Sequence, residues 1–210
     1  MSVEILKQIP ISGNFPEKHF GQTFNSQLWV KFTDNNFQEW VGCFPRPCYP
    51  TFNKVLTDNA NETAFIVAGG QCYLIDITTK ELLHKTDELP IFESAIHTTN
   101  PEYFLAGAYS CIYIFSDRKF IKCYEPNFLV NGIYFTEQKG QKAIGDLHSY
   151  EFHQDLNVGF EFDLNTNEIV INKDIKIRRF GTFESVIVTE KGGKENENMF
   201  TKIFKRLIGK

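Results

Sequence analysis

The stretch Phe65-Ile-Val-Ala-Gly69, followed by Cys72-Tyr-Leu-Ile-Asp76, sets out a pattern that this chain repeats. An apolar run leads into a glycine, and a second apolar run follows a few residues later. The order recurs in Tyr103-Phe-Leu-Ala-Gly107 with Cys111-Ile-Tyr-Ile-Phe115, and in Gln141-Lys-Ala-Ile-Gly145 with Ser149-Tyr-Glu-Phe152. The three glycines lie 38 residues apart. We interpret each copy as two strands joined by a tight turn at the glycine, whose missing side chain permits positive φ.

Turn residues divide the chain around these copies into units of four short strands. The unit at 53–85 shows this most clearly, with strands expected at Asn53–Thr57, Thr63–Ala68, Gln71–Ile77 and Glu81–Lys85. Similar units are expected at 93–124 and 129–163, and further short strands at 168–172, 175–179 and 184–189. Twenty-one phenylalanines and eight tyrosines also favour sheet over helix. The sequence therefore predicts an all-β fold of antiparallel four-stranded meanders.

A period near 40 residues with four strands per unit is typical of a β-propeller blade. The glycine, the apolar strand and the turn Asp76-Ile-Thr-Thr-Lys80 resemble the blades of pyrroloquinoline-type and kelch-like propellers over residues 53–125. The resemblance implies one β-propeller-like domain over residues 1–190, with about five blades at most and incomplete terminal blades. Val3–Ile9 could pair with the final strands to close the ring, because closure removes exposed edges. The alternatives are another all-β architecture, such as a sandwich, and an α+β fold.

Residues 191–210 differ from the rest of the chain. Residues 191–198 have the composition of a flexible polar linker. Apolar residues then recur at helical spacing from Met199 to Ile208, with lysine and arginine between them. The pattern predicts a short, basic amphipathic C-terminal helix that docks on the sheet, with a frayed end or a helix that contacts a membrane surface or a partner as the alternatives.

Length and charge limit the class of protein. The 210 residues suit one domain of ordinary size, and a net charge of -4 argues against a general nucleic-acid binder. No apolar run approaches the ~20 residues that span a bilayer, and the first residues do not read as a secretory leader. The five irregularly spaced cysteines are typical of free thiols in a reducing compartment. These features predict a cytoplasmic protein.

The hairpin expected over 27–44 and the proline-rich loop after it carry residue types that dominate protein interfaces. Leu28, Val30 and Phe32 should share one face of the hairpin. The two tryptophans could pack as a pair across it, and both being core residues is the alternative to an interface role. We expect a partner interface made of these aromatic and basic residues together with acidic loop residues: Trp29, Trp40, Arg46, Tyr49, Asp34, Asp58, Glu62, Asp87 and Glu88.

Candidate catalytic and metal-binding patterns are weak. The densest ionisable set is Asp146, His148, Glu151, His153 and Asp155, but alternation along a strand would point the two histidines to opposite faces. Cys43 and Cys48 have C-x4-C spacing without the second pair of a zinc ribbon. The chain has no Gly-x-Ser-x-Gly elbow, Walker loop or GxGxxG motif. We therefore expect no catalytic residues, no bound metal and no cofactor.

Three functional hypotheses follow. The first is a non-enzymatic, cytosolic protein-binding protein, specifically a bacterial immunity protein that occludes a toxin domain. Its acidic loops would match a basic toxin surface and speed association. The second is a propeller-type enzyme or a protein that binds a small ligand or metal at a central site, for which His97, Asp146 and His148 are the residues to test. The third is a structural scaffold protein.

Overall fold

The computed structural model is all-β. It describes residues 1–11, 13–22, 26–47, 52–86, 90–116, 118–126, 130–151, 154–171, 174–180 and 183–189. Within these ranges the chain forms strands and no helix. The predicted linker and helix at 191–210 lie outside the described residues. None of the described residues belongs to a helix that is long and apolar enough to cross a membrane.

The described strands form five sheets that follow one another along the chain. Sheet 1 has the order β1-β3-β4-β2, and sheets 2 to 4 each contain four consecutive strands; sheet 5 is a two-stranded hairpin. The strands of sheets 1 and 2 are β1 (Ser2–Ile5), β2 (Glu17–His19), β3 (Gln27–Thr33), β4 (Glu39–Pro45), β5 (Asn53–Asp58), β6 (Thr63–Ala68), β7 (Gln71–Asp76) and β8 (Leu82–Lys85). Those of sheets 3 to 5 are β9 (Phe92–Thr99), β10 (Glu102–Ala108), β11 (Ile112–Ser116), β12 (Lys119–Tyr124), β13 (Gly132–Lys139), β14 (Lys142–Glu151), β15 (Gln154–Asp163), β16 (Ile169–Ile171), β17 (Asp174–Phe180) and β18 (Phe183–Thr189).

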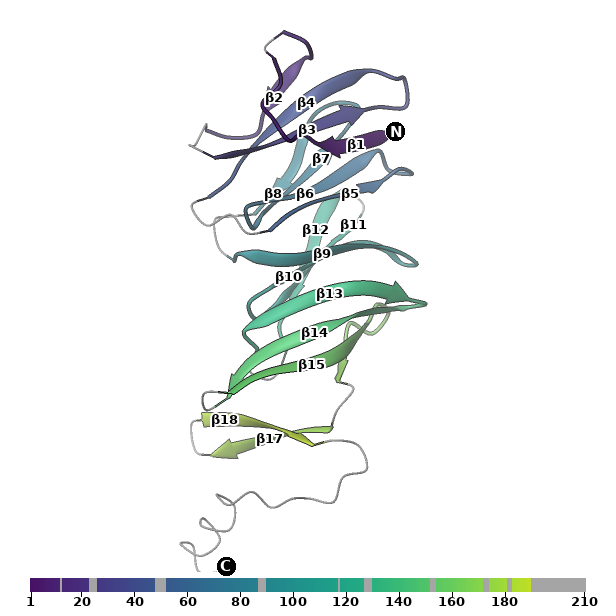
Figure 1. Ribbon diagram of the computed structural model, residues 1–210. Coiled ribbons are helices and arrows are strands. Elements are labelled where there is room, and N and C mark those ends of the chain that lie inside the picture. The colour runs from purple at the N-terminus through teal and green to yellow at the C-terminus, as the bar shows by residue number, and fades with distance from the viewer. Residues whose placement is uncertain are drawn as a thin grey trace, which may run out of the picture.

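The prediction of four-stranded units is therefore confirmed, and the four strands expected over 53–85 match β5 to β8 to within a residue. The bounds 129–163 expected for a further unit are wrong, because they hold three strands and the fourth strand of that sheet is β16. The pairings in sheets 2 to 4 are antiparallel, whereas sheet 1 includes one parallel pair, β2 with β4. The sheets stack face to face in chain order, with sheet 1 at one end of the stack and sheet 5 at the other (Figure 1).

The first strand does not close a ring. β1 pairs antiparallel with β3, its own neighbour in sheet 1, with Val3 opposite Phe32. Pairing of Val3–Ile9 with the final strands was expected, and that expectation is wrong. The reason is local: β3 offers β1 a free edge within the same sheet, and this short-range pairing covers that edge without closing a long loop.

Apolar residues fill the three spaces between sheets 1 to 4, because alternate residues of a strand face opposite ways. In β6, Ala64, Ile66 and Ala68 pack towards sheet 1. Phe65 and Val67 of the same strand pack towards sheet 3. A third layer, between sheets 3 and 4, contains Leu105, Ile112, Ile133 and Phe160 with their neighbours. Burying each valine, leucine, isoleucine or phenylalanine of these layers stabilises the fold by about 1.5–3 kcal/mol.

The glycines of the repeat have two different roles. Gly69 lies in the β6–β7 turn with φ of 56°, as predicted. Gly107 and Gly145 lie inside β10 and β14, so the turn assignment is wrong for them. A Cβ atom on Gly107 would lie 2.2 Å from the carbonyl oxygen of Ile133, and one on Gly145 would lie 2.1 Å from that of Tyr134. These two positions need glycine because another backbone comes close.

A second sequence repeat occurs in one turn of sheet 2 and one turn of sheet 4. Asp76-Ile-Thr-Thr-Lys80-Glu81 and Asp163-Leu-Asn-Thr-Asn167-Glu168 form the β7–β8 and β15–β16 turns. In each turn the aspartate carboxylate accepts hydrogen bonds from backbone amides of the turn. The fifth residue is left-handed in both, with φ of 61° and 58°. The backbone amide of each aspartate also bonds to the carbonyl of the final glutamate.

The tryptophans are both buried but lie on opposite faces of sheet 1. Trp40 stacks on Phe32 with a ring-centre distance of 4.3 Å and donates its indole hydrogen to the carbonyl of Ile77 in the next sheet. Trp29 lies opposite Cys43 on the other face. The expectation that the two tryptophans pack against each other is therefore wrong, because the odd and even positions of this hairpin face different layers.

Candidate functional site

Hairpin turns from successive sheets gather along one side of the stack, which we call the turn edge (Figure 1). It comprises the turns β3–β4, β5–β6, β7–β8, β9–β10, β11–β12, β13–β14 and β15–β16. Polar contacts join several of these turns across neighbouring sheets. Asn35 of sheet 1 donates to Glu62 of sheet 2, and Arg118 of sheet 3 pairs with Asp76 of sheet 2. Gln138 of sheet 4 accepts a hydrogen bond from the backbone amide of Thr99 in sheet 3.

Between sheets 2 and 3 the turn edge holds Asp58, His97 and Glu102. Asp58 ends β5 and lies on the same face as Leu56, whose side chain packs in the layer towards sheet 3. His97 in β9 is paired in register with Phe104 in β10, and Phe104 packs in that same layer. Glu102 is two residues before Phe104 and so shares its face. Strand alternation in two sheets thus directs all three side chains into one space.

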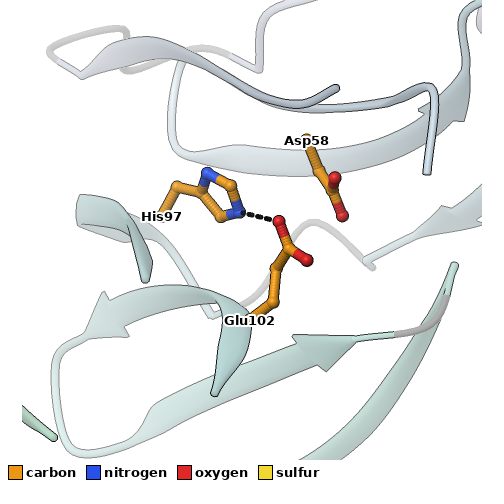
Figure 2. Close-up of side chains that lie close together, drawn as sticks. All are labelled: Asp58, His97 and Glu102. Carbon is orange, nitrogen blue, oxygen red and sulfur yellow. Dashed lines mark ion pairs between the residues drawn. The ribbon is translucent and has the colours of Figure 1, made fainter. Parts of the chain in front are cut away.

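The three side chains converge closely (Figure 2). One ligand-type atom from each lies within 4.8 Å of the others. The His97 Nε2 atom lies 3.4 Å from Oε1 of Glu102. The Asp58 residue is 4% exposed, whereas the side chains of His97 and Glu102 are 20% and 41% exposed. The cluster therefore runs from a buried carboxylate to a partly exposed one.

Two of the three side chains are held in place. Asp58 Oδ1 accepts hydrogen bonds from the backbone amides of Ala60 and Asn61 at 2.9 and 3.0 Å, and Oδ2 accepts one from the Asn61 side chain at 2.6 Å. The His97 ring packs on Phe104 with a ring-centre distance of 4.7 Å. Its Nε2 atom is buried and makes no hydrogen bond within the described part of the chain.

The two carboxylates have opposite electrostatic surroundings. Burial raises the pKa of Glu102, and the negative charge of Asp58 raises it further. Burial also acts to raise the pKa of Asp58, but the hydrogen bonds from Asn61 and Ala60 outweigh it, so that the pKa is lowered. The pKa of Asp58 is thus the lower of the two, and Glu102 takes up a proton more readily.

A small pocket adjoins the cluster. Its lining includes all three side chains, together with Phe104, Phe115 and Arg118. The cavity volume is about 10 Å³, roughly what one water molecule or small ion needs. The pocket can therefore hold a small cation, but it has no room for a sizeable organic substrate.

The fold places the predicted interface residues in different environments, some in the core and some at the surface. Trp40 is 1% exposed in the core. The carboxylates of Asp34 and Asp58 point inward and bond backbone amides of their own turns. Glu62 is part of the turn edge and accepts hydrogen bonds from Asn35 and Thr78. Trp29 is 9% exposed on the outer face of sheet 1, and Arg46 is half-buried against Gly69. Tyr49, Asp87 and Glu88 lie outside the described residues.

The other sequence candidates do not join this cluster. Among the described residues, His97 groups with Asp58 and Glu102, and not with Asp146 and His148 of β14. His153 and Cys48 lie outside the described residues, as do the side chains of Glu151 and Asp155. Cys43, Cys72 and Cys111 are buried, and the four described cysteines form no disulfide. Burial, with a smaller contribution from Glu17, raises the pKa of Cys43 to about 11.

Sequence reasoning named Asp58 and His97 for different roles and missed Glu102. One signal was present: His97 and Glu102 flank the short turn of a hairpin, so they fall on one face. The approach of Asp58 depends on the packing of sheet 2 on sheet 3, which no local pattern specifies.

A scan against protein-family models found no match to this chain, and a search of curated proteins found none either.

Proposed function

We propose that this protein is a non-enzymatic protein-binding protein that engages its partner with the turn edge. The partner we propose is a toxin domain that the protein occludes, as a bacterial immunity protein acting in the cytoplasm would. The observation that carries the proposal is the exposure of Phe37 at the tip of the β3–β4 hairpin.

Phe37 is 86% exposed, more than any other large apolar side chain among the described residues. Its φ of 62° is left-handed, which costs a residue other than glycine about 1–2 kcal/mol. The left-handed conformation belongs to the turn, since Glu62, Lys80, Arg118 and Asn167 share it, but the exposure of the aromatic ring does not stabilise the hairpin. An aromatic side chain exposed to this degree is therefore better explained by a binding role than by folding.

The turn that carries Phe37 is rigid. Asp34 Oδ1 accepts hydrogen bonds from the amides of Asn36 and Gln38, both at 2.8 Å, and the amide of Phe37 donates to the carbonyl of Asp34. A fixed turn that presents an aromatic side chain loses little conformational entropy on binding. Aromatic residues in such positions often supply a large part of the affinity of an interface.

Polar groups surround this anchor, as is usual at the rim of an interface. Asn35 in the same turn donates to Glu62, so that the Glu62 carboxylate lies beside the hairpin tip. An aromatic anchor beside a carboxylate suits a partner with an apolar pocket on a basic surface. That combination supports the proposal of a nuclease-like toxin as the partner.

The test is growth rescue. The protein would be co-expressed with the toxin domain encoded beside its gene, and the wild-type protein should restore growth. Phe37→Ala should weaken binding of the purified toxin domain about 30-fold, as expected for the loss of a hot-spot side chain, and should reduce rescue.

Tyr109→Ala is the matched control, because Tyr109 is a 52% exposed aromatic residue in the β10–β11 turn, at the other ends of the strands. It should bind like the wild type. Absence of rescue by the wild-type protein would refute the toxin as partner. Binding by Phe37→Ala at wild-type strength would refute the turn edge as the interface.

We also propose that the four-stranded sheets are blades of an incomplete propeller. In support, strand order follows the sequence in sheets 2 to 4, and the first strands of sheets 3 and 4 contact each other through Ser94 and Ile133 and through Glu93 and Tyr134. A crystal structure in which these sheets do not radiate from a common axis would contradict this arrangement.

A further inference from the structure

We propose that Asp58, His97 and Glu102 bind one divalent metal ion of the zinc class, which links sheet 2 to sheet 3 at the turn edge. This inference concerns a site that is separate from Phe37, and it does not depend on the proposed partner.

The donor set suits such an ion. One imidazole nitrogen and two carboxylate oxygens are common zinc ligands. Two ligands at about 2.1 Å from a tetrahedral ion lie about 3.4 Å apart, which matches the 3.4 Å between His97 Nε2 and Glu102 Oε1. No two of the three ligand atoms are more than 4.8 Å apart, so small side-chain rotations would bring all three within reach of one ion.

The charge balance also favours a cation. Asp58 and Glu102 bring two carboxylates together, and the guanidinium of Arg118 lines the same pocket. Arg118 is already paired with Asp76. A dication would therefore neutralise two carboxylates that otherwise repel each other in a partly buried space.

The site is largely formed without the ion. The Asp58 carboxylate is oriented by three hydrogen bonds, and these leave lone pairs free on its oxygens. The His97 ring is fixed by Phe104. Within the described residues its buried Nε2 atom makes no hydrogen bond, and its ion-pair partner is the Glu102 carboxylate at 3.4 Å. A buried nitrogen that lacks a hydrogen bond costs free energy, and a metal bond would satisfy it.

The number and type of ligands select among metals. Calcium takes six to eight oxygen ligands, and magnesium requires an octahedron of oxygens. Three protein ligands that include an imidazole suit zinc, with a fourth position left for water. The small space beside the cluster can hold that water.

The experiment uses full-length protein freed of metal with a chelator and titrated with zinc chloride in a calorimeter. The wild type should bind one zinc ion per chain, and its melting temperature should rise on binding because the ion joins two sheets. Magnesium and calcium chloride should give no comparable signal. His97→Gln and Glu102→Gln should each lose ~10-fold or more in affinity, since even outer partners of metal ligands contribute that much.

Two controls identify the site. Glu137→Gln removes a carboxylate from an exposed ion pair elsewhere on the surface and should bind zinc like the wild type. Cys123→Ser removes a thiol that is exposed, unlike those of the other three described cysteines, and should also leave the affinity for zinc unchanged. Circular dichroism of the apo variants checks that each is folded.

Cobalt(II) gives a readout that needs no variant. The cobalt-loaded wild type should show absorption bands of a four-coordinate nitrogen and oxygen site. Thiolate charge-transfer bands would place the metal on cysteines and overturn the proposal. The proposal would also be overturned if the wild type bound no zinc. The same holds if the folded His97→Gln and Glu102→Gln variants bound zinc as tightly as the wild type.

Discussion

Asp76 shows how one buried side chain links two sheets. It is 3% exposed, begins the β7–β8 turn and receives the guanidinium of Arg118 from the β11–β12 turn. Burial acts to raise its pKa, but hydrogen bonds from Thr79 and Arg118 outweigh burial, and the pKa is lowered. The ionised carboxylate is thus the form that the folded protein stabilises.

This gives a prediction for the dependence of stability on pH. Because the folded-state pKa of Asp76 lies below its unfolded value of about 3.9, its contribution is present above that value and is lost as pH falls through the folded pKa. Urea unfolding between pH 6 and pH 2.5 should show the free energy of unfolding decreasing below about pH 4, by at most ~1.4 kcal/mol per pH unit for this group.

Asp76→Asn should be less stable than the wild type at pH 6, and the difference should shrink in acid. Glu137→Gln, in an exposed ion pair, should follow the wild-type curve closely. A wild-type and an Asp76→Asn curve that run parallel down to pH 2.5 would contradict the role given to this carboxylate.

At the scale of elements, β10 and β13 come unusually close where Gly107 faces Ile133. Gly107 has ordinary strand geometry, and a side chain there would overlap the Ile133 carbonyl oxygen. Ser94 of β9 donates to the same carbonyl at 2.7 Å and accepts from the amide of Phe135 at 3.1 Å. A glycine and a serine hydroxyl together let β13 contact sheet 3 with its backbone groups satisfied.

Gly107→Val should therefore separate β10 from β13. We expect a loss of about 1–3 kcal/mol in the free energy of unfolding, or failure to fold, as measured by urea denaturation. Gly140→Asn is the control: the turn residue has φ of 59° and open space around it, and asparagine tolerates that conformation. A soluble Gly107→Val protein with wild-type stability would show that the close approach does not matter.

At the scale of the whole molecule, each apolar layer joins two neighbouring sheets. Phe44 packs between sheets 1 and 2, beside Phe20 and Tyr73. Phe160 packs between sheets 3 and 4. Two whole sheets lie between these positions. The energetics should therefore resemble those of a repeat protein, in which each unit interacts with its neighbours.

We predict additive effects of distant substitutions. Phe44→Leu and Phe160→Leu should each cost about 1–2 kcal/mol, and the double variant should equal their sum within ~0.5 kcal/mol. Phe65 and Phe104, stacked at 5.4 Å across one layer, provide the coupled control, whose double variant should deviate from additivity. Strong coupling between Phe44 and Phe160 in chemical denaturation would argue against nearest-neighbour stacking.

The sequence by itself determined the strands of this protein. Alternation and turn residues specified the hairpin around Asp34 and the four strands of 53–85, because side-chain direction in a strand and turn chemistry are local properties. The same logic placed Leu28, Val30 and Phe32 on one face, and all three pack in the layer between sheets 1 and 2. Turn chemistry also accounts for the turn Asp163–Glu168, whose sequence is similar to that of Asp76–Glu81.

Only the tertiary structure decided which backbones and side chains meet. Gly69 and Gly107 look alike in sequence, yet the first makes a turn and the second admits a neighbouring strand, because the difference depends on how β13 approaches β10. Likewise, the side chain of Asp58 lies close to those of His97 and Glu102, although about 40 residues of sequence separate Asp58 from the other two. Contacts of that range follow from the packing of one sheet on the next, which local periodicity does not encode.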